Sequence, residues 1–283
     1  MSEASLDADQ VKQYDRQIRL WGFAAQQKIT QARVLVHGCC GMSAEIVKNL
    51  VLAGLIDDGV GNVCLMDDAI AQEQDLGSQF LIPAECVGKM SRAEASIKSL
   101  QELNPKASIR CEKGEERILD EALLKQFDLV CVSDGAPNMQ KQFQLRYPSM
   151  EQAMSTSWSK LTKGKAQVNK LFYALQLLHA MQERAGSSSA PVENAEEVHL
   201  VRDELCKRHS LSASCFEDDL FRKLAMQVNL HVSMVCSIVG GMAADHMVKA
   251  LTGKEKPLRN YFIYDGRDGS GIVLDLGASE DDT

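Results

Sequence analysis

Residues 32–68 read ARVLVHGCCGMSAEIVKNLVLAGLIDDGVGNVCLMDD, and this stretch decides the fold. It predicts a buried strand at 33–37, a glycine turn at 38–43, a helix ending near Gly54 and a second strand at 62–66. The strands are continuous apolar runs, as in buried parallel sheets, whereas apolar residues between them recur at helical spacing. Such a unit opens a doubly wound nucleotide-binding fold. We therefore expect an α/β, Rossmann-like fold with a mostly parallel sheet flanked by helices.

The glycine turn departs from the G-x-G-x-x-G pattern of dinucleotide-binding loops. Gly38 and Gly41 are present, but Cys40 stands where a glycine lets the backbone touch phosphate, and Ser43 replaces the last glycine. We predict a scaffold whose own nucleotide pocket is impaired, or a loop that only joins strand to helix. Asp67 lies where a ribose-binding acid is expected, which leaves an NAD-dependent oxidoreductase as an alternative. Cys40 and Ser43 argue against that alternative.

The composition indicates a soluble protein with enough apolar residues for a full core. Of its 283 residues 45% are apolar, and the formal net charge of −8 disfavours nonspecific binding to nucleic acid. Residues 1–10 lack the apolar core of a secretory signal, and charges interrupt the apolar stretch 228–251, so we expect no membrane span. The nine cysteines are scattered without a C-x-x-C pair, which favours a reducing compartment. Cys206 and His209 form an isolated C-x-x-H, too little to predict a metal site.

The chain alternates strands and helices in its first half and is mostly helical afterwards. After the opening unit we expect helices at 92–103, 115–125, 139–146, 149–182, 194–209 and 218–251, strands at 107–112 and 128–133, and hairpin strands at 260–264 and 272–276. Small residues at Gly240 and Gly241 would let another backbone approach the last helix. One domain over 1–283 is expected, divided into an N-terminal helical arm 8–29, a nucleotide-fold half 30–146, a helical insert 147–217 with a flexible loop 185–197, and a C-terminal helix and hairpin 218–283.

The arm 8–29 has an apolar side and a predicted break at Gly22. Arg16 and Arg19 lie on its neighbouring faces. Taken alone, two arginines on a helix indicate a solvated surface, because charged side chains are mostly exposed.

Several stretches together resemble the E1 family of ubiquitin-like protein-activating enzymes, and within it the small subunits that serve SUMO. They include QYDRQIRLWG at 13–22, AEIVKNLVLAG at 44–54, SIVGGMAADHMVKAL at 237–251 and NYFIYDGRDGSGIV at 260–273. The resemblance implies a ThiF-type adenylation-domain fold and a heterodimer with a large subunit. That partner would hold ATP and Mg, adenylate the carboxyl terminus of SUMO, form the thioester on its own cysteine and serve the SUMO-conjugating E2.

The resemblance also implies site residues. Arg16 matches the family arginine that reaches across to the partner's ATP phosphates, and Arg19 is a weaker second candidate. An arginine suits this role because its planar, permanently charged donor fork stabilises charge on phosphate oxygens. Active members carry asparagine and arginine where this chain has Gly77 and Ser78, and their lysine appears as Arg92. We therefore expect no ATP or metal in this chain's own pocket, no thioester-forming cysteine and no activity of the chain alone.

The chain departs from the family pattern near residue 145. Several dozen residues that the family has between Leu145 and Tyr147 are absent here, which leaves open a truncated, non-catalytic isoform or a binding partner of the large subunit. Met234 replaces a proline and Asp245 begins a changed dipeptide in the last helix. From the resemblance we expect a nuclear protein, with the cytoplasm as a second location, and neither nucleic acid nor membrane as a partner.

Overall fold

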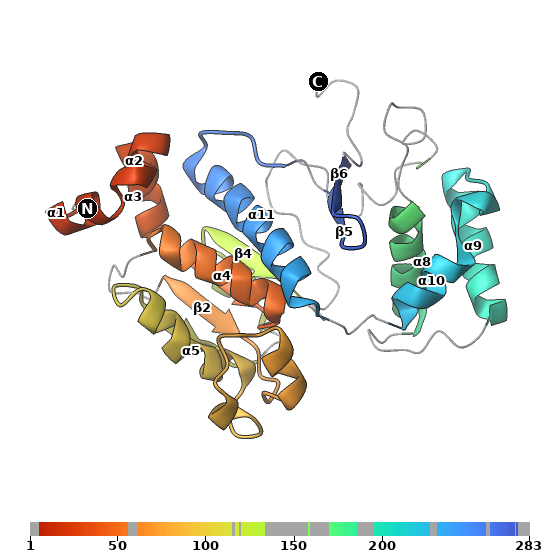
Figure 1. Cartoon of the computed structure of the whole chain (residues 1–283), viewed down its shortest axis with the longest axis horizontal. Coiled ribbons are helices and arrows are strands. Elements are labelled where there is room, and N and C mark those ends of the chain that lie inside the picture. The colour runs from red at the N-terminus through yellow and green to blue at the C-terminus, as the bar shows by residue number, and fades with distance from the viewer. Residues whose placement is uncertain are drawn as a thin grey trace. The chain divides into compact units, whose positions relative to one another are not determined.

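The computed structural model describes residues 6–55, 62–114, 117–118, 120–133, 158, 170–185, 195–226, 231–258, 261–274 and 276 (Figure 1). The chain divides into two compact units. The first contains Met1–Met139 and His231–Pro257, and the second contains Gln140–Leu230 and Leu258–Thr283. The predicted C-terminal segment 218–283 is therefore shared between the units, while the expectation of one domain stays a prediction.

The first unit is built on a parallel sheet, as predicted. Its strands are β1 (Val34–His37), β2 (Val63–Met66), β3 (Ile109–Cys111) and β4 (Leu129–Val132), in the order β3-β2-β1-β4. Val34 pairs with Val63 on one side and with Leu129 on the other. The strand order reverses between β1 and β4, and in open α/β sheets ligands bind at the carboxyl ends of strands at such a point. The glycine turn lies at this position.

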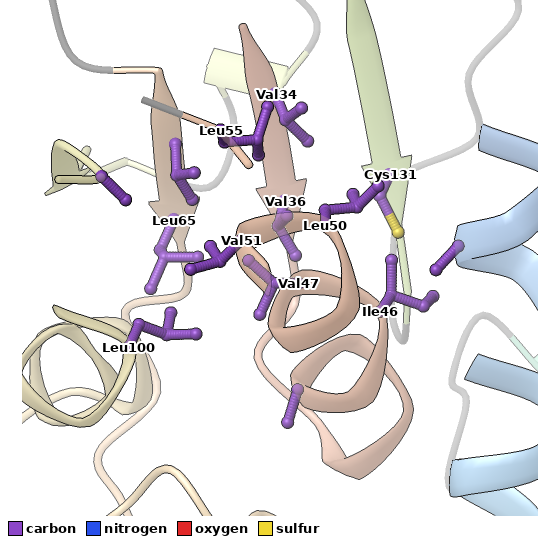
Figure 2. Close-up of a cluster of buried hydrophobic side chains, with 14 of the residues drawn as sticks. Val34, Val36, Ile46, Val47, Leu50, Val51, Leu55, Leu65, Leu100 and Cys131 are labelled. Carbon is purple, nitrogen blue, oxygen red and sulfur yellow. The ribbon is translucent and has the colours of Figure 1, made fainter. Parts of the chain in front are cut away.

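Helices cover one face of the sheet. These are α4 (Gly41–Ala53), α5 (Arg92–Leu103) and α11 (Ser233–Thr252), with α3 (Phe23–Gln31) of the arm. Figure 2 shows how Val36 of β1 and Leu65 of β2 meet Val47 and Val51 of α4. Burial of such side chains stabilises each by about 1.5–3 kcal/mol. The opposite face has a smaller cluster, made by Leu35, Cys64, Met66, Ile118 and Leu123.

Helix α11 runs beside α4, as Figure 1 shows. A Cβ on Gly240 would lie 2.7 Å from Cβ of Glu45, whereas one on Gly241 would meet nothing within 4 Å. The predicted close approach is thus confirmed at Gly240 and wrong at Gly241. By length and composition α11 could also cross a membrane. In the structure one side of it lies on α4, where Ser237 donates a hydrogen bond of 2.6 Å to Glu45.

Two predicted helices are interrupted. The arm consists of α1 (Ala8–Gln13), α2 (Asp15–Trp21) and α3. The predicted break at Gly22, whose φ is +88°, is confirmed, and the chain also turns at Tyr14, which the sequence did not indicate. The stretch 218–251 is divided into α10 (Asp218–Ala225) and α11, since these helices pack in different units. The predicted helix 115–125 is reduced to α6 (Glu121–Leu124) in its described part. Helix α5 has the predicted bounds.

The second unit is a helical cluster with a hairpin. It contains α8 (Lys170–Ala185), α9 (Ala195–His209), α10, and the antiparallel strands β5 (Tyr261–Asp265) and β6 (Ser270–Leu274). Phe172 at its centre is fully buried, and His209 stacks on Trp158 with ring centroids 3.6 Å apart. The imidazole of the C-x-x-H pair is therefore part of an aromatic stack. Short 3-10 turns lie at Glu73–Gly77, Ala84–Cys86 and Ala213–Cys215. The predicted helix 139–146 and most of the loop 185–197 lie outside the described residues.

Candidate functional site

The glycine turn begins at Gly38, directly after β1. Its φ is +81°, and its N–H donates to the carbonyl of Met66 at 2.9 Å. A Cβ at this position would lie 1.9 Å from the carbonyl oxygen of Ser133, so only glycine fits. Ser133 also donates its hydroxyl proton to the Gly38 carbonyl at 2.7 Å. The predicted tight turn is confirmed. Ser133, the residue directly after β4, packs against this turn at the carboxyl ends of β1 and β4.

The start of α4 is covered by the chain's own groups. Cys40 is the N-cap residue and is buried, and Ser43 donates its hydroxyl proton to the Cys40 carbonyl at 3.0 Å. A Cβ on Gly41 would lie 2.7 Å from Cβ of Ser78. Ser78 thus lies against the first turn of α4, where helix amide groups would otherwise meet a phosphate. The sequence indicates that Ser78 replaces an arginine of active family members, but no signal in it indicates this contact with Gly41.

Asp67 is held by three groups of the same unit. Its side chain is fully buried and accepts the N–H of Cys39 at 2.7 Å and that of Ala69 at 3.0 Å. The Arg92 guanidinium lies 2.9 Å from its Oδ2, with Asp75 at 3.8 Å as a second carboxylate. Burial lowers the pKa of Arg92, but the charge and contact of Asp67 together with the charge of Asp75 more than offset this, and the pKa is raised. A carboxylate with these partners has little capacity left for a ribose hydroxyl.

Gln79 completes the closure of the turn. Its side-chain amide donates to the Cys39 carbonyl at 3.1 Å, and its Oε1 accepts the N–H of Leu81 at 3.1 Å. Burial raises the pKa of the Cys39 thiol well above its ordinary value, and the nearby Asp67 charge adds to the effect. The cavity between Cys39, Ser43 and Gln79 holds only about 10 Å³, about the space of one water molecule.

These contacts decide whether a nucleotide fits the turn. A phosphate at the start of α4 would meet the side chains of Cys40 and Ser78, and a ribose at Asp67 would compete with Arg92. At these two points the described residues leave no space for a phosphate and no unpaired carboxylate for a ribose. No group of three His, Cys, Asp or Glu side chains able to hold a metal occurs in the described part of the chain. Asp134, which the resemblance places near a metal-binding acid of active members and which is expected here only to end a strand, lies outside the described residues.

The arm presents its two candidate arginines differently. Arg19 donates from Nε to Asp15 one helical turn away, at 3.1 Å. Arg16 is exposed, and none of the residues described in the structure gives it a hydrogen bond or an ion pair. Tyr14, two positions earlier, is buried to 3% exposure. The arm therefore has one fixed side and one side on which Arg16 is available to a second molecule.

Comparison with known proteins finds one family over nearly the whole chain. The sequence model of the ThiF family matches residues 14–281. SUMO-activating enzyme subunit 1A of Arabidopsis thaliana is 30% identical over 328 residues, which span 99% of this chain and 99% of that protein. SUMO-activating enzyme subunit 1 of Homo sapiens is 27% identical over 345 residues, or 96% of each chain. Both matched lengths exceed 283 residues, so these relatives carry segments that this chain lacks.

Solved structures agree on the fold. Escherichia coli MccB with ATP superposes with a TM-score of 0.54 at 14% identity, covering 94% of this chain and 72% of that one. The structure of PaaA superposes with a TM-score of 0.51 at 15% identity and covers 98% of this chain and 76% of that one. At these identities the likeness concerns the fold alone.

Proposed function

Because this chain belongs to the ThiF family, we propose that it is the small subunit of a heterodimeric SUMO-activating E1 enzyme. Its relatives are SUMO-activating enzyme subunits, which supports an E1 role. In this proposal the large subunit binds ATP and Mg²⁺, adenylates SUMO, forms the thioester and meets the SUMO-conjugating E2. This chain completes the partner's adenylation site and is inactive alone.

One observation carries the proposal: the first arginine of the arm is unpaired within the described residues and exposed. An arginine that reaches a phosphate in another subunit must not already be bound within its own chain. Arg16 meets this condition, whereas Arg19 is engaged by Asp15 and is the weaker candidate. In the partner's site the Arg16 fork would bind the phosphate oxygens and stabilise charge that develops there as pyrophosphate leaves. The chain's own turn, filled by its own side chains, supplies a rigid scaffold.

Pyrophosphate exchange tests the proposal. The chain is purified together with the large SUMO-activating subunit, and exchange between ATP and pyrophosphate is measured with and without SUMO. Loss of one donor aimed at developing charge costs about 100- to 1,000-fold in rate. We expect that loss for Arg16→Ala, and a smaller loss for Arg19→Ala.

Arg33→Ala is the matched control, because Arg33 is a half-exposed arginine of the same unit that lies before β1 and 4.0 Å from Asp128. Its exchange rate should equal that of the unmodified pair. SUMO-dependent exchange that survives Arg16→Ala unchanged would refute the role of Arg16.

A second candidate function follows from the shorter chain. The relatives' matched lengths exceed this chain, so they carry residues that this chain lacks. A stable pair with no exchange would identify a non-catalytic binding partner of the large subunit, such as a truncated isoform. We extend the proposal to a nuclear location, which fluorescence microscopy of the tagged chain tests.

A further inference from the structure

Helices α2 and α3 are joined at a sharp glycine turn. Gly22 has a φ of +88°, and its N–H donates to the Ile18 carbonyl at 2.8 Å. A Cβ on Gly22 would lie 3.2 Å from Nζ of Lys254, which follows α11. The turn sets the direction in which α2 leaves the body of the unit. The contacts that hold this turn therefore determine where Arg16 is presented.

Gln26 connects three elements around this turn. Its side chain is fully buried, and its amide nitrogen donates to the Ala53 carbonyl at 2.8 Å. Carbonyls in the last turn of a helix have no partner within the helix, so Gln26 satisfies one at the end of α4. Its Oε1 also accepts the indole N–H of Trp21, the last residue of α2, at 3.4 Å. One side chain thus joins α2 and α3 to α4.

Tyr14 makes a second contact at the same end of α4. A Cβ on Gly54 would lie 3.0 Å from Cζ of the Tyr14 ring and 2.8 Å from Nε2 of Gln26, so both side chains lie directly on this glycine. Gly54 has a φ of +111°, which side chains other than glycine rarely adopt. Asn104 fixes the neighbouring backbone by donating to the carbonyls of Val51 at 3.1 Å and Leu55 at 3.3 Å. Tyr14 and Gln26 therefore rest on a rigid base.

We propose that Tyr14 and Gln26 are positioning residues for Arg16, holding α2 against Gly54 so that the arginine reaches the partner's nucleotide in one fixed orientation. The proposal rests on the function proposed above for Arg16. Tyr14 is the N-cap residue of α2 and is buried, whereas Arg16, the second residue of this helix, is exposed, so the contact of Tyr14 fixes the end of the helix that carries the arginine. A misplacement of about 1 Å can cost about 100-fold in rate, so a loosened arm should act almost as a lost arginine.

A double-mutant cycle in the purified pair tests the proposal. Gln26→Leu keeps much of the buried volume but removes the hydrogen bonds to Ala53 and Trp21, and we expect exchange to fall by about 10- to 100-fold. In the Arg16→Ala background the same change should lower exchange by less than about 2-fold, because a residue that acts only through Arg16 adds nothing once it is gone. Gln126→Leu is the control, since Gln126 is an exposed glutamine after α6 whose side-chain amide donates to the Ala122 carbonyl at 3.3 Å.

Tyr14 provides a second pair of variants if Gln26→Leu impairs folding. Tyr14→Phe keeps the ring on Gly54 and should retain exchange, whereas Tyr14→Ala should lose it as Gln26→Leu does. Fluorescence of Trp21 in a Trp158→Phe chain reports whether the arm is docked. We expect red-shifted emission for Gln26→Leu and Tyr14→Ala and no shift for Tyr14→Phe.

Two results would overturn the positioning role. One is a Gln26→Leu loss of the same size with and without Arg16, which would mean that Gln26 acts on folding or assembly instead. The other is full exchange together with red-shifted Trp21 emission, which would mean that a loose arm is sufficient. Full exchange in Arg16→Ala alone is a separate result. It would refute the proposed function, and with it the need to position this arginine.

Discussion

The glycine turn and the N-terminal arm both belong to the first unit, but they treat their polar groups in opposite ways. In the turn, Asp67 has Arg92 and two backbone N–H groups as partners, and Gln79 takes up the Cys39 carbonyl. On the arm, Arg16 has no such partner among the described residues and faces solvent. A region whose polar groups all bind one another has few left to bind a ligand. A rigid region that leaves a polar side chain unpaired can use that side chain to bind a second molecule.

This difference explains why two arginines of the same unit have different fates. The family pattern predicts that Arg16 contacts the partner's phosphates, whereas Arg92 stands in place of a lysine of active members and is expected to make no phosphate contact. Arg92 is paired with the buried Asp67 carboxylate, so its role is to stabilise the turn. Arg16 makes no hydrogen bond or ion pair with the described residues, so its side chain is free to bind elsewhere. Substitutions in the turn should therefore change stability, and those at Arg16 should change activity alone.

The largest effect is expected where the turn leaves no space. Gly38→Ala would place a methyl group 1.9 Å from the backbone oxygen of Ser133 at a φ of +81°. Overpacking and the left-handed conformation together should cost about 4 kcal/mol. Urea unfolding of the isolated chain measures the loss.

Gly88→Ala is the control for this experiment, because Gly88 has a φ of +71° but nothing within 4 Å of its Cβ position. It should lose only the conformational part, about 1–2 kcal/mol. Equal losses at both glycines would show that Ser133 yields easily and that the turn is not closed.

Next in size is the loss of the internal ion pair. Arg92→Met keeps the length of the side chain but leaves the buried Asp67 carboxylate without its cation. Breaking such a pair should cost about 3 kcal/mol, somewhat less than for a fully buried pair because Arg92 is partly exposed. Unfolding in urea tests this, and calorimetry with ATP tests whether an emptied turn binds nucleotide. Measurable ATP binding by the Arg92→Met chain would contradict the view that Cys40 and Ser78 also block it.

Local signals in the sequence predicted much of this unit. In the structure helix α5 begins after a capping box formed by Ser91 and Glu94 and ends at Asn104, which precedes a proline, so both of its bounds depend on local signals. Strands β1, β2 and β4 follow from their apolar runs, which are typical of a parallel sheet covered on both faces. Strand β3 is half-buried and contains Arg110, so only the alternation of strands and helices indicates it. These features depend on neighbours within a few residues.

Contacts between residues far apart in the sequence could not be predicted from such local signals. Arg92 lies 25 positions from Asp67, Gln79 lies 40 from Cys39, and Ser133 lies 95 from Gly38, so no local pattern announces them. The break between α10 and α11 also depends on which unit each helix packs in. For the site, the Cys40 substitution was visible in the sequence, but the closure around it was not.

Alkaline pH should reveal whether the turn excludes solvent. Cys131 of β4 is buried near Cys40, and burial raises the pKa of its thiol from 9.0 to about 12. The unfolded chain loses this proton near pH 9 and the folded chain does not, so the contribution to stability is complete below pH 9 and is lost as pH rises toward 12. Between pH 9 and 11, unfolding free energies of the wild-type chain should fall relative to Cys131→Ala by about 1.4 kcal/mol per pH unit.

The matched control for this titration is Val36→Ala, which removes a buried apolar group but no titrating one. Its difference from the wild-type chain should not change with pH. A flat difference for Cys131→Ala as well would mean that water reaches the thiol, and the turn would then be more open than the contacts of Ser133 and Ser78 indicate.

The smallest stability effect is expected at the residue with the largest proposed role. Arg16→Ala should change the urea midpoint of the isolated chain by less than the equivalent of about 0.5 kcal/mol, because an exposed side chain without a partner contributes little to folding. Arg19→Ala is the comparison, since it breaks a surface pair with Asp15 worth about 0.3–0.5 kcal/mol. A loss above about 1 kcal/mol for Arg16→Ala would mean that this arginine is bound within its own chain. It would then resemble Arg92, and the contrast between arm and turn would fail at the point on which the proposed function depends.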